Sequence, residues 1–212
     1  MTQTQTITEV FTSLAEVETR LNLRQNKDLL FFPEWYDQLP SLTPAEENSL
    51  DRVQNSYLYN SSEGSLTEAT VNLIVISPLL YLAGFCDPPF KIQAEKTVEV
   101  TAADNNNIYR GRIDVLVLKN QFWLGIIESK QTRFSFSVAL PQILAYMMGN
   151  PNSEQPIFGL VTNGDHFLFL KLIKQPHAEY SLSTDFSIYG LPENELYQVL
   201  KVMKRIAINL NN

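Results

Sequence analysis

The chain has 212 residues, a formal net charge of −7 and a hydrophobic content of 44%. This length can bury one substantial core and fits one domain with additions. No apolar run reaches the roughly 18 residues that span a bilayer, and the first residues lack a signal-peptide pattern, so we expect a cytoplasmic protein without membrane contact. A single cysteine and two histidines exclude an internal disulfide and a Cys/His zinc site, so any metal must be held mainly by oxygen.

The charge is distributed unevenly along the chain. Residues 1–90 hold 4 basic and 12 acidic residues, 91–133 hold 7 and 5, and 134–212 hold 5 and 6. Binding that depends only on electrostatics requires Lys and Arg to neutralise phosphates, so the net charge argues against a protein that coats nucleic acid. Only the segment 91–133 is locally basic.

The first half of the chain predicts helices separated by an irregular connection. Apolar residues at helical spacing predict a helix over 7–24. The segment 29–48 carries three prolines and many aromatic residues, which favours an irregular connection. Thr43, followed by Pro44 and Glu46, is typical of a capped helix start, and that helix should run to about residue 59.

After the polar break NSSEGS, the chain predicts an apolar helix, three strands and then a second helix. Gly84 should end the first of these helices and Pro78 should bend it. Turn-rich segments join the three strands, which predicts an antiparallel meander. The first turn of the second helix should lie close to Pro141. The three strands cover 91–100, 108–119 and 121–130, and the second helix covers about 137–149.

The last part of the chain predicts a hairpin and a terminal helix. Asn163-Gly164 favours a tight turn between two strands. Pro192 opens an amphipathic helix with apolar residues on one face. The strands cover 157–163 and 166–173, and the helix covers 192–209. The order of all these elements predicts an α/β fold.

Charged residues interrupt the two apolar strands of GRIDVLVLKNQFWLGIIESKQ, residues 111–131. Side chains alternate along a strand, so Glu128 and Lys130 should project from the same side. If the two strands form a hairpin, Asp114 and Glu128 can lie near each other, where two carboxylates repel unless a cation lies between them. Mg²⁺ binds through one or two carboxylates and water. Alternatively, Asp114 pairs with Arg112 or Lys130, and Glu128 only ends a strand.

Asp114, followed by Glu128-Ser129-Lys130 after an apolar strand, resembles the core of the PD-(D/E)XK nuclease superfamily. The proline of that motif is absent, because Ile113 precedes the aspartate. Gln142 and Tyr146 are four residues apart and so lie on one helix face. They are similar to the Gln-x-x-x-Tyr motif of RecB-like nucleases and type I restriction subunits.

Glu68 resembles the acid on the first helix of that fold. The order of the motifs over residues 64–174 resembles the N-terminal nuclease domain of type I restriction endonuclease R subunits and related small cyanobacterial proteins. The resemblance implies a three-layer restriction-endonuclease-like core, α-β-β-β-α-β, with a mixed sheet. Residues 1–63 would then be an N-terminal helical extension packed on the core, and 175–212 a C-terminal extension with a terminal helix.

The resemblance also implies Mg²⁺-dependent hydrolysis of phosphodiesters in DNA, with Mn²⁺ as a substitute. Metal ligands would be the side chains of Glu68, Asp114 and Glu128 and the backbone carbonyl of Ser129. Lys130 would act on the attacking water or on transition-state charge. Catalytic roles are implied for Asp114, Glu128, Lys130, Gln142 and Tyr146, of which the last two would contact the DNA backbone or hold Lys130.

Several alternatives remain open from the residues alone. Glu68 can form a capping box with Ser65, Gln142 can be a surface amide, and Tyr146 can be a core residue. Cys86 is expected as a small core filler and His166 as a solvent-facing side chain, without roles.

At the level of the whole chain, no GxxxxGK[ST] motor motif is present, so the expected activity is that of a restriction-type module without a translocase. A protein partner that supplies DNA targeting fits the acidic surface. The rival functions are an inactive nuclease-fold module that binds protein or nucleic acid, and a homo-oligomeric assembly module that uses the acidic N-terminal addition.

Overall fold

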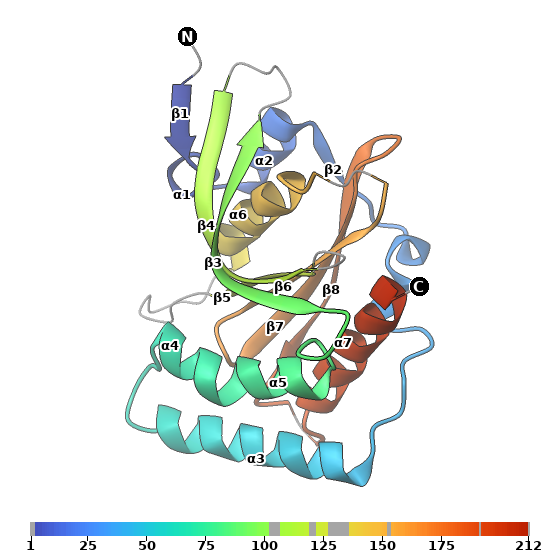
Figure 1. Ribbon diagram of the computed structural model, residues 1–212. Helices are drawn as coiled ribbons and strands as arrows, with labels where there is room; N and C mark the ends of the chain where they lie inside the picture. Colours follow the sequence, from blue (N-terminus) through green and yellow to red (C-terminus); the bar gives the residue numbers. More distant parts are fainter. Residues whose placement is uncertain are drawn as a thin grey trace.

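Within the described residues, eight strands form one mixed sheet (Figure 1). The computed structural model describes residues 3–101, 107–118, 122–126, 136–151, 154–190 and 192–211. The strands are β1 (Gln3–Thr6), β2 (Leu23–Gln25), β3 (Lys91–Thr101), β4 (Asn107–Leu118), β5 (Phe122–Ile126), β6 (Ile157–Thr162), β7 (His166–Ile173) and β8 (Ala178–Ser187). Their order is β1-β4-β5-β6-β7-β8-β2, and β3 also pairs with β4.

The sheet combines hairpins with parallel pairs. β3, β4 and β5 pair antiparallel in sequence, which confirms the predicted meander. β6, β7 and β8 also pair antiparallel, while β5 and β6 are parallel. The helix between β5 and β6 crosses one face of the sheet, as parallel neighbours require.

Helices cover both faces of the sheet, which confirms a three-layer α/β core (Figure 1). One face is covered by α3 (Pro44–Ser61), by α4 (Glu68–Val71), η3 (Asn72–Ile76) and α5 (Ser77–Leu82), and by α7 (Leu196–Asn211). The other face is covered by α1 (Ile7–Val10), α2 (Leu14–Leu21) and α6 (Phe136–Met148). We call these the α3/α7 face and the α2/α6 face.

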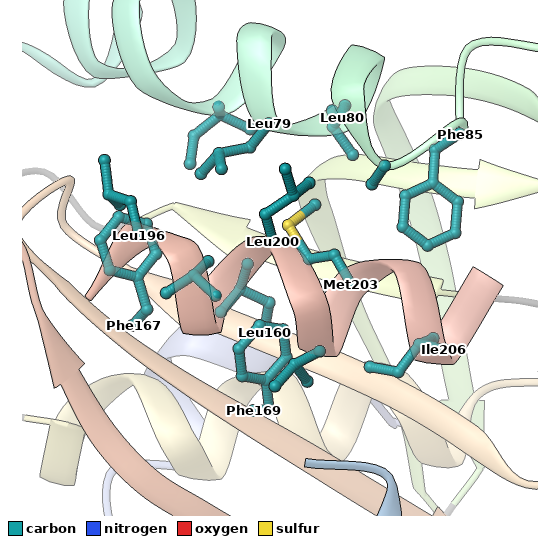
Figure 2. Packing of buried hydrophobic residues seen from close by; sticks show 14 of the residues in the cluster. Leu79, Leu80, Phe85, Leu160, Phe167, Phe169, Leu196, Leu200, Met203 and Ile206 are labelled. Carbon is teal, nitrogen blue, oxygen red and sulfur yellow. The ribbon is translucent and has the colours of Figure 1, made fainter. Parts of the chain in front are cut away.

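The alternation of side chains along β7 separates the two cores. Phe167 and Phe169 are buried on the α3/α7 face, together with Leu200 of α7 (Figure 2). Leu168 and Leu170 are buried on the α2/α6 face. Each buried aliphatic or aromatic side chain contributes about 1.5–3 kcal/mol relative to exposure, so both faces stabilise the fold.

The start of α3 confirms the predicted capping box. The Thr43 hydroxyl accepts from the Glu46 amide at 3.3 Å, and the Glu46 carboxylate accepts from the Thr43 amide at 2.7 Å. Two amides without partners inside the helix are thereby satisfied. Pro44 stands at the first helical position, where no amide donor is needed.

Other predicted elements differ from the structure at their ends. The helix expected over 7–24 is wrong as one element, because the Ser13 hydroxyl accepts from the Glu16 amide and starts α2 separately. The terminal helix starts at Leu196 rather than near residue 192. The Asn194 side chain accepts from the Leu196 amide at this start. Gly84, at φ +82°, follows the end of α5 as expected.

Two prolines lie inside helices, at different distances from the helix start. Pro78 is the second residue of α5, which directly follows the π-helical turn η3. The hydroxyl of Ser77, the first residue of α5, donates to the Asn72 carbonyl at 2.8 Å. Pro141 lies inside α6, which starts at Phe136 and continues past it, so the first turn comes earlier than expected.

The N-terminal segment contributes strands as well as helices. β1 pairs with the first half of β4, and β2 pairs with β8 at one edge of the sheet. Its apolar side chains are buried on the α2/α6 face, namely Ile7, Phe11, Val17, Leu21 and Leu23. This segment is therefore built into the core.

Candidate functional site

The β4–β5 hairpin positions the backbone of the predicted motif. Val115 pairs with Leu124. Because β4 and β5 are antiparallel, Asp114, the residue before Val115, lies one position nearer to the C-terminal end of β5. The side chain of Asp114 lies outside the described part of the structure, as do Glu128, Ser129 and Lys130. The hairpin on which the acid pair depends is confirmed, and the approach of the acids to each other stays a prediction.

The C-terminal ends of β5 and β6 lie side by side at the same end of the sheet. β5 is parallel to β6, and Ile126 pairs with Thr162, the last residues of the two strands. The Glu-Ser-Lys motif begins two residues after Ile126. The loop of residues 163–165 follows β6 at this same end of the sheet.

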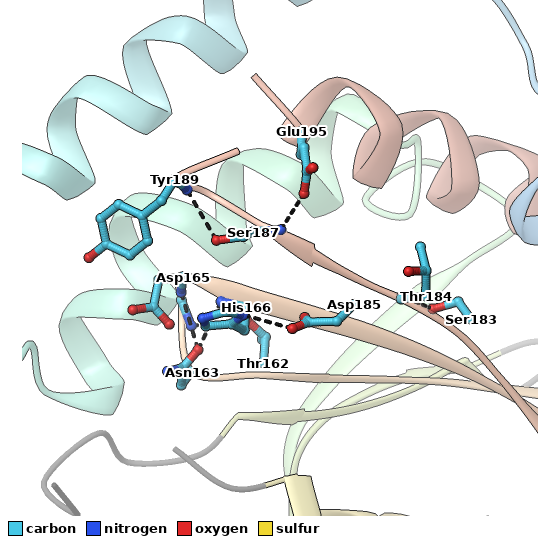
Figure 3. A network of polar contacts seen from close by, with 11 residues as sticks. Thr162, Asn163, Asp165, His166, Ser183, Thr184, Asp185, Ser187, Tyr189 and Glu195 are labelled. Carbon is cyan, nitrogen blue, oxygen red and sulfur yellow. Dashed lines mark hydrogen bonds and ion pairs between the residues drawn. The ribbon is translucent and has the colours of Figure 1, made fainter. Parts of the chain in front are cut away.

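Side chains fix the backbone of the 163–165 loop (Figure 3). The side-chain oxygen of Asn163 accepts from the amides of Asp165 at 3.2 Å and His166 at 2.9 Å. The buried hydroxyl of Thr162 accepts from the Gly164 amide at 2.9 Å. Gly164 has φ +99°, a conformation that favours glycine. The predicted hairpin is confirmed, with three residues in its loop.

The helix that carries Glu68 packs against this loop. A Cβ atom on Gly164 would lie 2.9 Å from both methyl groups of Val71, the last residue of α4. Glu68 begins α4, about 4.5 Å earlier along the axis. The helix cap is Thr67, whose hydroxyl accepts from the Thr70 amide at 3.2 Å, so the alternative of a Ser65 capping box is wrong.

Gln142 and Tyr146 lie on α6, on the opposite face of the sheet. Gln142 is partly exposed, whereas Tyr146 is buried, as expected for a core residue. The Tyr146 hydroxyl lies against β4, because a Cβ on Gly111 would be only 2.5 Å from it. Gly111 is three residues before Asp114, or about 10 Å along the strand. The helix therefore contacts the strand that carries Asp114.

The described side chains alone do not form a metal centre. Among them, no group of three or more His, Cys, Asp or Glu residues is close enough to hold a metal ion. Glu68 is the only predicted side-chain ligand among these residues. Hard oxygen ligands suit Mg²⁺, so the proposed site depends on Asp114 and Glu128.

Sequence reasoning missed a histidine–aspartate pair beside the loop (Figure 3). His166 Nδ1 lies 2.9 Å from Asp185 Oδ2, and their side chains are 34% and 44% exposed. The Asn-Gly turn placed His166 near the turn, but Asp185 lies in β8, which was not predicted. Cys86, expected in the core, is exposed.

Tyr57 of α3 packs against the same loop on the side where Val71 lies. Its ring lies against Gly164, since a Cβ there would be 2.9 Å from Cε2. Burial raises the pKa of the Tyr57 hydroxyl well above its usual range, and the neighbouring Asp165 and Tyr189 raise it further. The phenol therefore stays neutral and acts as a hydrogen-bond donor.

Part of the chain that forms this site matches a known family model. The fold is a three-layer α/β core in which β5 and β6 end side by side. Residues 90–178 match the family model described as Type I restriction enzyme R protein N terminus. This part of the chain is thus similar to a restriction-enzyme-related nuclease module. No curated protein matches the chain.

Among the described residues, no helix has the length and apolar character to cross a membrane.

Proposed function

We propose that the chain contains a nuclease module that hydrolyses phosphodiesters in DNA with Mg²⁺. The observation that supports this most is that the elements of the proposed site meet at one end of the sheet. The paired ends of β5 and β6, the strand of Asp114 and the helix of Glu68 all converge there. Within the matched region 90–178, the Glu-Ser-Lys motif begins two residues after Ile126, the last residue of β5.

The proposed ligands are the carboxylates of Asp114, Glu128 and Glu68, with the backbone carbonyl of Ser129. When bound, Mg²⁺ supplies charge neutralisation at the phosphate and a more acidic bound water. Lys130 would place its ammonium group beside the reacting phosphate, where a fixed positive charge stabilises charge that develops in the transition state.

Tyr146 and Gln142 would act from α6. The buried Tyr146 hydroxyl reaches β4 at Gly111, so it can hold the strand that carries Asp114 in register with the helix. Gln142 is one helical turn away and partly exposed, so its amide can donate to a DNA phosphate or to Lys130.

DNA is the proposed substrate, and a protein partner or a second copy of the chain is proposed to assist its binding. The net charge of −7 weakens autonomous attraction to a polyanion. A partner that delivers DNA would compensate for that weakness.

A cutting assay tests the proposal. We expect supercoiled plasmid to be nicked or linearised with Mg²⁺ or Mn²⁺ and to stay intact with EDTA. Glu128→Ala and Lys130→Ala should each reduce the rate by about 10²-fold or more, because the first removes a proposed metal ligand and the second removes a positive charge beside the reacting phosphate. Glu63→Ala and Lys91→Ala change exposed residues of the same types and should cut like the wild type.

Circular dichroism and denaturant unfolding should give the same fold and stability for all four variants. Equal cutting by wild type and Glu128→Ala would contradict the nuclease function. A wild type that binds DNA without cutting it would favour the inactive, nucleic-acid-binding module.

A further inference from the structure

The His166–Asp185 pair has a geometry that stability alone does not explain. Its Nδ1–Oδ2 distance is 2.9 Å, and both side chains are more than a third exposed on the exit side of the 163–165 loop. Exposed ion pairs usually contribute about 0–1 kcal/mol. The pair therefore adds little to folding, while it fixes the orientation of an imidazole ring at the surface.

The position of this pair relates it to the candidate site. Thr162 pairs with Ile126 on one side and with Phe167 on the other, so β6 lies between β5 and β7. Neighbouring strands are about 4.8 Å apart, which places the start of β7 about 10 Å from the end of β5. One bound DNA strand can contact both places.

The loop beside the pair presents side chains rather than backbone amides. The amides of Gly164, Asp165 and His166 all donate to side chains of Thr162 or Asn163. They are therefore occupied and do not form an anion-binding nest. Any anion recognised here must be bound by a side chain.

His166 is the side chain in this network that can carry positive charge (Figure 3). Asp185 faces it from β8, and Asp165 precedes it in the loop. Glu195, which precedes α7, accepts from the Ser187 amide at 2.6 Å. The Tyr57 phenol lies beside Asp165 and Tyr189. Phosphate oxygens would be repelled by the acids, so binding here requires the protonated imidazole.

We propose that His166 is a DNA-contacting residue whose protonated imidazole ring contacts a backbone phosphate next to the one that is cut. Asp185 holds Nδ1 and so sets the direction of the ring, as a second partner does for many functional histidines. That this phosphate lies next to the one that is cut rests on the proposed function. The phosphate contact itself needs neither metal nor catalysis.

DNA binding without metal tests this contact. Fluorescence anisotropy of a short fluorescein-labelled DNA duplex is measured with the full chain in EDTA, at pH 5.5 and pH 8.0. The wild type should bind more tightly at pH 5.5. His166→Gln should bind about fivefold more weakly than the wild type at pH 5.5 and equally at pH 8.0. Asp185→Ala keeps the ring but removes the acceptor that orients it, so we expect an intermediate loss.

The second histidine provides a matched control. His177 is exposed in the β7–β8 turn, at the opposite end of β7, and His177→Gln should keep the full pH dependence. Because acids that titrate at pH 5.5 are common to these histidine variants, the difference between them isolates His166. Equal binding by His166→Gln and wild type at pH 5.5, or no binding by the wild type, would overturn the proposal.

The outcome is independent of the cutting assay. If wild type and Glu128→Ala cut equally, the nuclease function fails, yet a pH-dependent loss in His166→Gln would still establish the phosphate contact. If cutting behaves as proposed and His166→Gln binds normally, only the phosphate contact is wrong.

Discussion

The two faces of the sheet are packed by different means. The α3/α7 face contains a buried ion pair, Lys171 with Glu34, at 2.7 Å. The α2/α6 face brings a helix so close that two glycines, Gly111 and Gly159, lie where a Cβ would meet α6 side chains. On the first face a charge pair fixes which segments meet, and on the second the absence of side chains fixes how closely they meet.

The ion pair joins three parts of the chain far apart in sequence. Lys171 lies on β7, Glu34 belongs to the short turn η2 (Pro33–Trp35), and Asn209 of α7 donates to the same Glu34 oxygen at 3.3 Å. The Lys171 ammonium also lies 5.9 Å from the Phe31 ring centre and 5.8 Å from that of Phe158. This contact anchors the proline-rich connection, for which sequence patterns gave no partner.

The glycine contacts instead concern the helix that carries Gln142 and Tyr146. Both of these residues are proposed to act at the site, so close packing on the α2/α6 face is expected to affect function as well as stability, whereas the buried ion pair on the α3/α7 face is expected to affect mainly stability. Three variants separate the two contributions.

The largest expected effect comes from breaking the buried pair. Lys171→Met leaves the Glu34 carboxylate buried without its cation, which should lower the free energy of unfolding by about 3–5 kcal/mol. Guanidinium unfolding followed by circular dichroism measures the change. The double variant Glu34→Gln/Lys171→Met should recover much of the loss, because no buried charge remains. A double variant as unstable as Lys171→Met would contradict this account.

A smaller effect on stability and a larger one on function is expected from Gly111→Ala. The new Cβ would lie 2.5 Å from the Tyr146 hydroxyl, so α6 and β4 must separate, at a cost of about 1–3 kcal/mol. Cutting should fall more than stability predicts, since the shift displaces the strand of Asp114. Unfolding curves and plasmid cutting, measured on the same preparation, check both effects.

Gly159→Ala is the matched control on the same face. Its Cβ would lie 2.9 Å from the Met147 sulfur, the flexible part of an adaptable side chain. We expect a smaller loss of stability and near-normal cutting. If both glycine variants behaved alike, the close contact of Tyr146 with β4 would have no special role.

The smallest expected effect is a pH dependence at the end of α6. Lys174 donates to the Met148 carbonyl at 2.6 Å and to the Asn150 carbonyl, and burial lowers the pKa of its ammonium to about 8. An unfolded lysine has a pKa of about 10.4. Between these values the unfolded chain binds the extra proton, so Lys174 should make the chain more stable as pH rises from about 8 to 10.

Urea unfolding at pH 7.0, 8.5 and 9.5 measures this contribution. The stability of the wild type relative to Lys174→Gln should increase over that range. Lys91→Gln, at the exposed start of β3, should track the wild type. A constant difference between wild type and Lys174→Gln would show that Lys174 does not titrate in this window.

Much of the framework could be predicted because its signals are local. The capping residues of α3, the turn-rich joints of the meander and the Asn-Gly loop each act within a few residues. Their hydrogen-bond partners are close in sequence, so the pattern contains both halves of each interaction.

The candidate site could be predicted in part for the same reason. Alternation along β4 and β5 indicated a hairpin with Asp114 near its end, and helical spacing put Gln142 and Tyr146 on one face of α6. The pairing of His166 with Asp185 could not be found in this way, because it depends on β8 lying beside β7.

The sequence by itself determined where the chain alternates, where its helices are capped, and that one acid-bearing hairpin is followed by an apolar helix. Only the tertiary structure decided that β1 pairs with β4, that β2 and β8 lie side by side, and that Glu34 meets Lys171. The physical reason is that a short polar strand carries no periodic signal of its own. Its backbone groups and charges are satisfied by residues distant in sequence, and packing selects those partners.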